Sequence, residues 1–180
     1  MEKSQFDEII LTETQSVQTE DDIDIGKEID EYLNYLNRLY DSIKDWLKDY
    51  TEKERINITE VDYTLIEDLT GPYHTKKMEI YLGAKKFTLL PKGTFLAGVK
   101  GRVDFESSKD RIKIGLCDEK LTEPHIQIFN SEKEKQESEA KKEPQKINWL
   151  WKVITDPPRI QFITLDRNVF YDIFAKLIYG

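Results

Sequence analysis

The chain has 180 residues, of which 38% are hydrophobic and 34% are charged, and its net charge at pH 7 is −8. A chain of this length can bury one core, whereas two full domains would be cramped. The acidic total gives no reason to expect the whole molecule to bind nucleic acid non-specifically.

The single cysteine, Cys117, excludes an internal disulfide and fits a reducing compartment. The first residues have no charged-then-apolar signal pattern, and no stretch approaches the length of a membrane span. We therefore expect a cytoplasmic protein that makes no membrane contact.

Residues 1–23 are acidic and polar, and their one apolar patch consists of Phe6, Ile9, Ile10 and Leu11. A segment that can bury so little surface is predicted to be a disordered arm. A second interpretation is that the arm is a tethered segment, which docks on a partner or on a basic surface of the protein when either is free.

A long amphipathic helix is predicted over 24–55, because apolar residues recur there at spacings of three and four. Asp24 is a plausible N-cap, and acidic residues crowd the first turns, where they interact favourably with the helix dipole. The stripe consists of Ile29, Leu33, Leu36, Tyr40, Ile43, Leu47 and Tyr50, and it is widened by Tyr32, Leu39 and Trp46.

A stripe this wide packs on a domain core or on several helices. The helix is also longer than is needed to cover one face of a small sheet. We therefore hypothesise that part of the helix, with Leu36, Ile43 and Leu47, pairs with another helix as in a coiled coil. The second helix would belong to another copy of the chain or to a protein partner.

The residues that follow are ambiguous, since 56–70 fit a short helix or an alternating strand about equally well. From 73 to 130 the pattern predicts a curled antiparallel β-meander or a small β-barrel. Met78 and Ile80 alternate with polar residues, and Gly83-Ala84 is suited to a tight turn.

The alternation of apolar and polar residues along the meander predicts that the outward face of the sheet is basic. Between Tyr73 and Cys117 there are ten Lys and Arg residues against four Asp and Glu residues. A protein partner, another acidic ligand or single-stranded nucleic acid would fit such a face. The predicted contact residues are Lys77, Tyr81, Lys86, Lys100, Arg102, Arg111 and Lys113.

The C-terminal third begins with a charged segment over 131–146, which we expect to be a mobile loop. Residues 147–180 then predict a hairpin, in which Trp149 and Trp151 share a face, and a helix capped by Asp166. These elements are too apolar to stand alone, so we expect them to close the core of the meander. The whole of 24–180 is thus predicted to be a single α+β domain.

A catalytic or metal site finds little support. Asp104 with Asp118, Glu119 and Lys120 resembles the carboxylate set of a metal-dependent nuclease, but alternation places Asp104 and Asp118 on opposite faces. His74, Cys117 and His125 match no zinc spacing. We predict no catalytic residue, cofactor or metal.

These patterns favour a non-catalytic interaction or assembly module of the cytoplasm, which binds a partner or a second copy through the long helix. The alternative is an accessory protein that binds nucleic acid on the basic sheet face. An enzyme is the third possibility.

Overall fold

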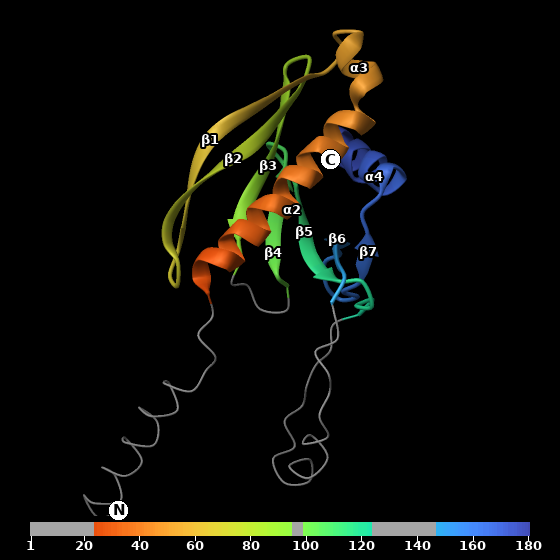
Figure 1. Cartoon of the computed structure of the whole chain (residues 1–180). Helices are drawn as coiled ribbons and strands as arrows, with labels where there is room; N and C mark the ends of the chain where they lie inside the picture. Colours follow the sequence, from red (N-terminus) through yellow and green to blue (C-terminus); the bar gives the residue numbers. More distant parts are fainter. Residues whose placement is uncertain (1–23, 95–98, 124–146) are drawn as a thin grey trace, which may run out of the picture.

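The computed structural model describes residues 24–94, 99–123 and 147–180. The chain has an α+β fold, in which helices pack on an antiparallel sheet of seven strands (Figure 1). The arm predicted at 1–23 and the charged loop predicted at 131–146 lie outside the described residues. The elements are α2 (Ile25–Trp46), α3 (Lys48–Glu52), β1 (Asn57–Glu67), β2 (Gly71–Leu82), β3 (Lys85–Gly93), β4 (Gly101–Glu106), β5 (Arg111–Asp118), β6 (Trp149–Ile154), β7 (Phe162–Thr164) and α4 (Arg167–Tyr179).

The strands are arranged in the sheet in their order along the chain, and each pairs antiparallel with the next. The predicted meander is therefore present, and the C-terminal hairpin joins it as β6 and β7. A closed barrel requires the first strand to pair with the last. Within the described chain, β1 and β7 each pair on one side only, so the sheet is open and the predicted small barrel does not form.

Two local patterns explain the first hairpins. The segment 56–70, whose pattern fits a short helix or a strand equally well, contains strand β1. Its Val61 and Leu65 pair with Lys77 and Tyr73 of β2. Gly83 has a φ of 59°, a conformation that glycine adopts at little cost. It makes the predicted two-residue turn between β2 and β3.

Helix α2 begins after Asp24, whose carboxylate accepts a hydrogen bond of 3.1 Å from the backbone N–H of Lys27. It ends at Trp46, and Leu47 separates it from the short α3, so the helix predicted over 24–55 is divided in two. Helix α2 crosses the sheet diagonally, and α4 lies beside its C-terminal end (Figure 1). Among the described helices, none is long and apolar enough to cross a membrane.

The core lies between the sheet and the two long helices. Phe170 of α4 stacks on Phe105 of β4 with ring centroids 5.7 Å apart, and Phe174 meets Phe87 of β3 edge-on at 5.0 Å. The C-terminal helix therefore closes the core of the meander, as the sequence predicts. Its buried side chains are Phe170, Ile173, Phe174 and Leu177.

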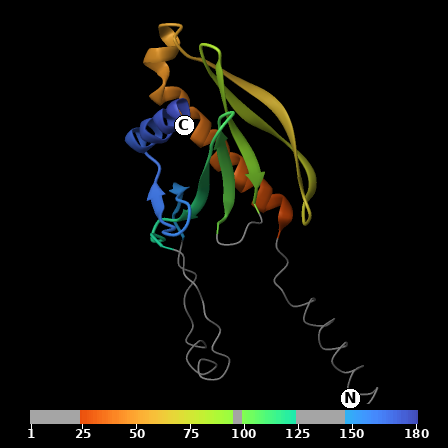
Figure 2. The same cartoon turned by 180° about the vertical axis from the view of Figure 1, so that it is seen from behind.

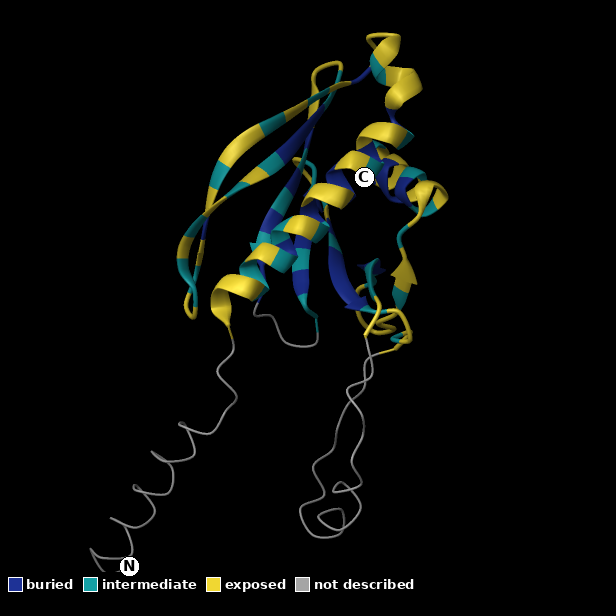
Figure 3. Ribbon diagram, in the orientation of Figure 1, coloured by how far each residue is buried: buried dark blue, intermediate teal, exposed yellow. Residues whose placement is uncertain are grey.

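The coiled-coil hypothesis for α2 is wrong for the folded chain. Leu36, Ile43 and Leu47 are only 1%, 0% and 2% exposed, because they pack in the core formed with the sheet. The exposed residues of α2 lie on the side turned away from the sheet (Figure 3). A sheet of seven strands is wider than the small sheet expected from the sequence, and it covers the apolar stripe without a second helix.

The sheet face opposite α2 and α4 is here called the outer face. Seen from behind, the strands β3 to β5 lie in front of α2 (Figure 2). No helix of the described residues packs on this face, since the core residues of both long helices contact the other one.

Candidate functional site: an aromatic groove and an ion-paired sheet face

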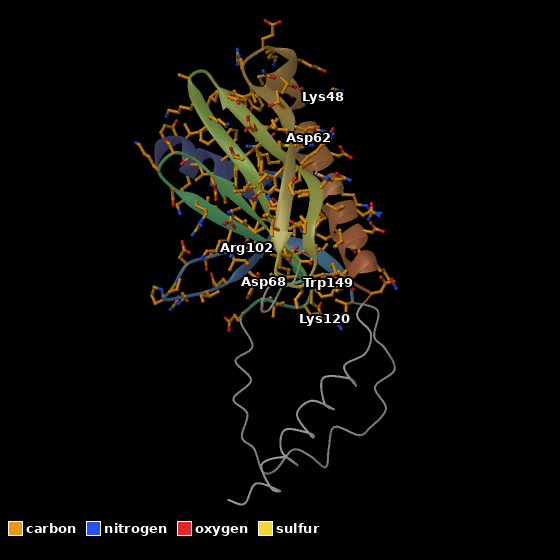
Figure 4. All side chains as sticks on the ribbon, turned by 90° about the vertical axis from the view of Figure 1, so that its left-hand side faces the viewer. Lys48, Asp62, Asp68, Arg102, Lys120 and Trp149 are labelled. Carbon is orange, nitrogen blue, oxygen red and sulfur yellow. The ribbon has the colours of Figure 1, made fainter. Side chains whose placement is uncertain are left out.

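The outer face carries most of the predicted contact residues. The strand register places six of the seven on it, and Figure 4 shows the labelled Arg102 on the side of the sheet away from α2. These six are Lys77, Tyr81, Lys86, Arg102, Arg111 and Lys113.

Glu79 forms ion pairs with the basic residues at the β2 end of this face. Its carboxylate lies 2.8 Å from the ammonium of Lys86 and 3.2 Å from that of Lys77, and it accepts a hydrogen bond of 2.6 Å from the hydroxyl of Tyr81. The hydrogen bonds from Lys86 and Tyr81 lower the pKa of Glu79 to about 2. The basic residues here are thus bound to an acid of their own chain.

Asp104 has the same role in the middle of the face. It is fully buried, and the guanidinium of Arg102 donates to both of its carboxylate oxygens at 2.6 and 2.8 Å. Arg111 and Lys92 approach it to 3.7 and 3.9 Å. The hydrogen bonds to Asp104 raise the pKa of Arg102. Three basic side chains of this part of the face are thus engaged with one buried carboxylate of their own chain.

Lys100 lies elsewhere, so its prediction as an outer-face residue is wrong. Its ammonium lies 3.1 Å from Glu28 and 2.9 Å from Glu31, both on α2. It also lies 5.1 Å from the ring centroid of Trp149. Two carboxylates of α2 therefore attract the side chain to the helix side of the molecule.

The nuclease-like acids are not brought together. Asp104 pairs with Lys113 across the β4–β5 register, and Asp118 is five residues further along β5, hence on the opposite face. Asp118 instead accepts a hydrogen bond of 2.9 Å from the backbone N–H of Lys120. Within the described ranges, no three His, Cys, Asp or Glu side chains are grouped closely enough to hold a metal ion.

The second surface is a groove between α2 and β6, with a volume of about 350 Å³. All three tryptophans of the chain line it: Trp46 from α2, and Trp149 and Trp151 from β6. Figure 4 shows the labelled Trp149 on the α2 side of the sheet. Tyr35 and Arg38 complete the aromatic and basic part of the lining. We call this surface the aromatic groove.

Local structure explains why these side chains converge. Tyr35, Arg38, Ser42 and Trp46 are three or four residues apart, so they lie along one side of α2. Trp149 and Trp151 are two residues apart on a strand and so share a face, as predicted. The walls of the groove are thus a helix and a strand rather than loops.

Hydrogen bonds fix the two walls to each other and to α4. The indole N–H of Trp151 donates to the backbone carbonyl of Tyr35 at 3.1 Å. The hydroxyl of Tyr171 on α4 donates to the backbone carbonyl of Trp46 at 2.6 Å. The groove is therefore held in shape before any ligand arrives.

Several donors in the groove face solvent. No described residue accepts a hydrogen bond from the indole N–H of Trp46 or Trp149, and Arg38 forms no ion pair with a described carboxylate. The guanidinium of Arg38 lies 5.8 Å from the ring centroid of Tyr35. No buried side-chain nitrogen or oxygen of the described chain lacks a partner, so these donors are accessible. The groove thus combines apolar walls with free hydrogen-bond donors.

Lys152 on β6 and Cys117 on the neighbouring β5 both have buried side chains. The ammonium of Lys152 is enclosed and donates to the backbone carbonyls of Glu119 and Leu121 at 2.7 and 2.6 Å. Burial raises the pKa of the Cys117 thiol to about 11, which keeps it protonated and unreactive at neutral pH. The strand register places both side chains on the outer-face side of the sheet, where they are buried, so both support the fold.

The groove was not predicted from the sequence, although two of its signals were visible. These were the shared face of Trp149 and Trp151 and the widening of the α2 stripe at Trp46. Their meeting depends on a contact across 116 residues, which periodicity does not reveal.

Comparisons of the chain with protein-family models, with curated proteins and with solved structures found no match. Any functional assignment therefore depends on the geometry of the two surfaces.

Proposed function

We propose that the protein is a non-catalytic interaction module, which binds a segment of a partner protein in the aromatic groove. The observation that carries this proposal is the convergence of all three tryptophans and Tyr35 on one solvent-facing groove. Tryptophan, tyrosine and arginine contribute most of the binding energy at protein interfaces, and Arg38 supplies the third of these.

The rigidity of the groove supports the same function. A site built on a helix and a strand loses little conformational entropy on binding, so more of the contact energy appears as affinity. The hydrogen bond between Trp151 and Tyr35 holds the two walls together without a ligand.

The free donors define the chemistry of the partner. Arg38 favours a carboxylate, and the indole N–H groups of Trp46 and Trp149 favour carbonyl oxygens. The aromatic walls favour aliphatic or aromatic side chains. The partner segment is therefore a short peptide with apolar anchors and an acidic flank.

The alternative, nucleic-acid binding on the outer face, has weaker support. A phosphate would have to displace Glu79 from Lys77 and Lys86, or Asp104 from Arg102. Tyr81, the outward aromatic predicted to stack on a base, is already hydrogen-bonded to Glu79.

We also propose the cytoplasm as the compartment, because the one cysteine is a buried free thiol.

The proposal is tested by matched charge reversals on the full chain. Arg38→Glu changes the groove, whereas Arg55→Glu changes an exposed arginine after α3 that does not line it. Proteins captured from native lysate are compared for wild type and both variants, after circular dichroism has confirmed that each is folded. We expect Arg38→Glu alone to lose the specific partner.

The bound segment of that partner is then synthesised as a peptide and titrated into the wild-type protein. Because every tryptophan lines the groove, binding should shift the tryptophan emission to the blue. Equal capture by Arg38→Glu and wild type, or a peptide that binds without a change in emission, would place the partner elsewhere and refute the proposal.

A further inference from the structure

We infer that a second copy of the chain pairs with the free edge of β1, so that two sheets join into one antiparallel sheet across a two-fold axis at Tyr63. The inference goes beyond the proposed function, because β1 lies at the opposite edge of the sheet from the strands that line the aromatic groove. It rests on the length of the edge, the direction of its backbone groups, and the fit of β1 to a copy of itself.

Strand β1 is a long edge strand. It has 11 residues, with no proline, lysine or arginine among them, and its register with β2 runs without a bulge. Its other side pairs with no described strand, and Figure 4, which faces this edge, shows β1 with the labelled Asp62 in front of the helices. Natural edge strands avoid pairing with other chains by being short, bulged or rich in lysine or proline. The opposite edge strand β7 has only 3 residues, whereas β1 has none of these protections.

The pairing with β2 shows which backbone groups of β1 point to the free side. Facing residues of an antiparallel pair alternately exchange hydrogen bonds and point these groups away from each other. Pro72 has no N–H, so its pair with Ile66 is of the second kind. The same alternation turns the carbonyl of Lys76 away from β1, in agreement with its hydrogen bond of 2.9 Å from the hydroxyl of Tyr40. The residues of β1 whose N–H and C=O groups point to the free edge are therefore Ile58, Glu60, Asp62, Thr64 and Ile66.

A copy of β1 fits this edge in one register. The longest antiparallel pairings of β1 with itself place Val61, Asp62 or Tyr63 on the two-fold axis. An axis at Val61 would set Glu60 opposite Asp62, and an axis at Asp62 would set two copies of that carboxylate opposite each other. Like charges in directly opposite positions are destabilising. An axis at Tyr63 sets no two acids of the strands opposite each other.

The register about Tyr63 also satisfies the backbone. It sets Glu60 opposite Ile66 of the other copy, and Asp62 opposite its Thr64, and the reverse pairs follow by symmetry. All of these residues point their backbone groups to the free edge. Four such pairs would form about eight hydrogen bonds between the copies.

Exposed apolar side chains lie along the same edge. Ile66 is 76% exposed and Val61 is 37% exposed. In the register about Tyr63, Val61 lies opposite Leu65 of the other copy, and Ile66 is diagonal to its Ile58. Cross-strand apolar pairs stabilise antiparallel strands. The pairing would thus cover side chains that the single chain leaves in solvent.

The acids of β1 already interact within their own chain, so the edge does not select a basic strand. Glu60 forms ion pairs with Lys44 of α2 and Lys76 of β2, and Lys76 also lies opposite Asp62 in the β1–β2 register. The carboxylate of Glu67 accepts hydrogen bonds from its own chain.

The net charge of −8 on each copy still opposes association. Salt screens this repulsion, so pairing of two copies should strengthen as the salt concentration rises. A basic strand of another protein would show the opposite dependence, because salt would weaken its attraction to the acidic chain.

Sedimentation velocity of the full chain tests the pairing. We expect wild type to shift from monomer to dimer between about 10 and about 200 µM, and to do so more readily at about 500 mM than at about 50 mM NaCl. A wild-type chain that stays monomeric throughout would overturn the inference. If capture of a foreign protein by that monomer were lost in Thr64→Pro, the edge would belong to another chain instead.

A matched pair of proline variants locates the contact. Thr64→Pro removes an N–H that points to the free edge, and leaves the pairing with β2 intact. His74→Pro is the control, because His74 lies opposite Thr64 on β2 and its N–H is likewise turned away from the partner strand. We expect only Thr64→Pro to stay monomeric, after thermal melting has shown that both variants fold. Equal dimer formation by the two would contradict pairing through β1.

Disulfide trapping tests the register. Cys117 is buried, so an introduced cysteine is the accessible thiol. In Tyr63→Cys the thiols of two copies would face each other, whereas in Val61→Cys they would be four residues apart along the strands, about 14 Å. We expect Tyr63→Cys to form the covalent dimer at least about tenfold faster in glutathione buffer. Equal rates would overturn the proposed axis.

The groove variant Arg38→Glu separates this inference from the proposed function. It lies at the other end of the sheet, so we expect its dimer to form as in wild type. A dimer that is lost in Arg38→Glu but kept in Thr64→Pro would place the contact between copies at the groove and refute pairing through β1.

Discussion

The indole N–H of Trp151 on β6 donates a hydrogen bond of 3.1 Å to the main-chain carbonyl of Tyr35 on α2. The two residues are 116 positions apart in the chain, and their contact joins the walls of the aromatic groove. Trp149, two residues earlier on the same strand, lines the groove without an acceptor for its own indole N–H among the described residues.

This difference predicts the outcome of two matched substitutions. Trp151→Phe keeps an aromatic ring but removes the hydrogen bond, so we expect it to lower the free energy of unfolding by about 1 kcal/mol. Trp149→Phe removes no hydrogen bond and should be closer to wild type. Urea denaturation followed by circular dichroism measures both. A loss in Trp149→Phe equal to that in Trp151→Phe would show that the bond does not hold the groove walls.

A close approach at Gly101 gives a second prediction. A Cβ atom built at Gly101 would collide with the ring of Tyr32, whose hydroxyl donates to the carbonyl of Arg102 at 2.8 Å. We expect Gly101→Ala to lower the free energy of unfolding by about 1–3 kcal/mol through overpacking. Gly26→Ala, in the first turn of α2, should be neutral or stabilising. Thermal melting of both variants tests this, and equal midpoints would contradict the tight contact.

The buried ammonium of Lys152 gives a third prediction. Lys152→Met keeps the aliphatic stem but leaves the carbonyls of Glu119 and Leu121 without their donor. We expect a loss of about 2–3 kcal/mol in the free energy of unfolding. Lys113→Met is the control, because Lys113 is partly exposed and its ion pair with Asp156 contributes about 0–1 kcal/mol. Similar losses for the two variants would mean that burial of Lys152 has no special role.

Glu79 predicts a pH dependence. Its pKa is about 2 in the folded protein, below the usual value of 4.5, because Lys86, Tyr81 and Lys77 stabilise the charged form. The resulting stability is fully present above pH 4.5 and is lost as the pH falls towards 2. We expect Glu79→Gln to be less stable than wild type at pH 7 and to lose less stability on acidification. Parallel profiles of unfolding free energy against pH would show that Glu79 is not so stabilised.

The elements that depend on short-range patterns were predictable from the amino-acid sequence. The three-and-four spacing and Asp24 predicted α2 with its N-cap, and Gly83-Ala84 predicted the turn between β2 and β3. The apolar character of 147–180 predicted that the C-terminal helix would close the core, and its Phe170 and Phe174 are buried there. In each case the physical cause lies within a few residues of the feature, so periodicity and turn chemistry were sufficient.

Which surfaces are available for binding depends instead on contacts between distant parts of the chain. Leu36 and Ile43 have the spacing of a partner interface, but the seven-stranded sheet buries them. Lys100 has the parity of an outward residue, but Glu28 and Glu31, about 70 residues earlier, attract it to α2. The groove likewise forms where α2 meets β6. Whether a side chain is covered or paired depends on residues that are distant in the sequence, and local patterns carry no information about them.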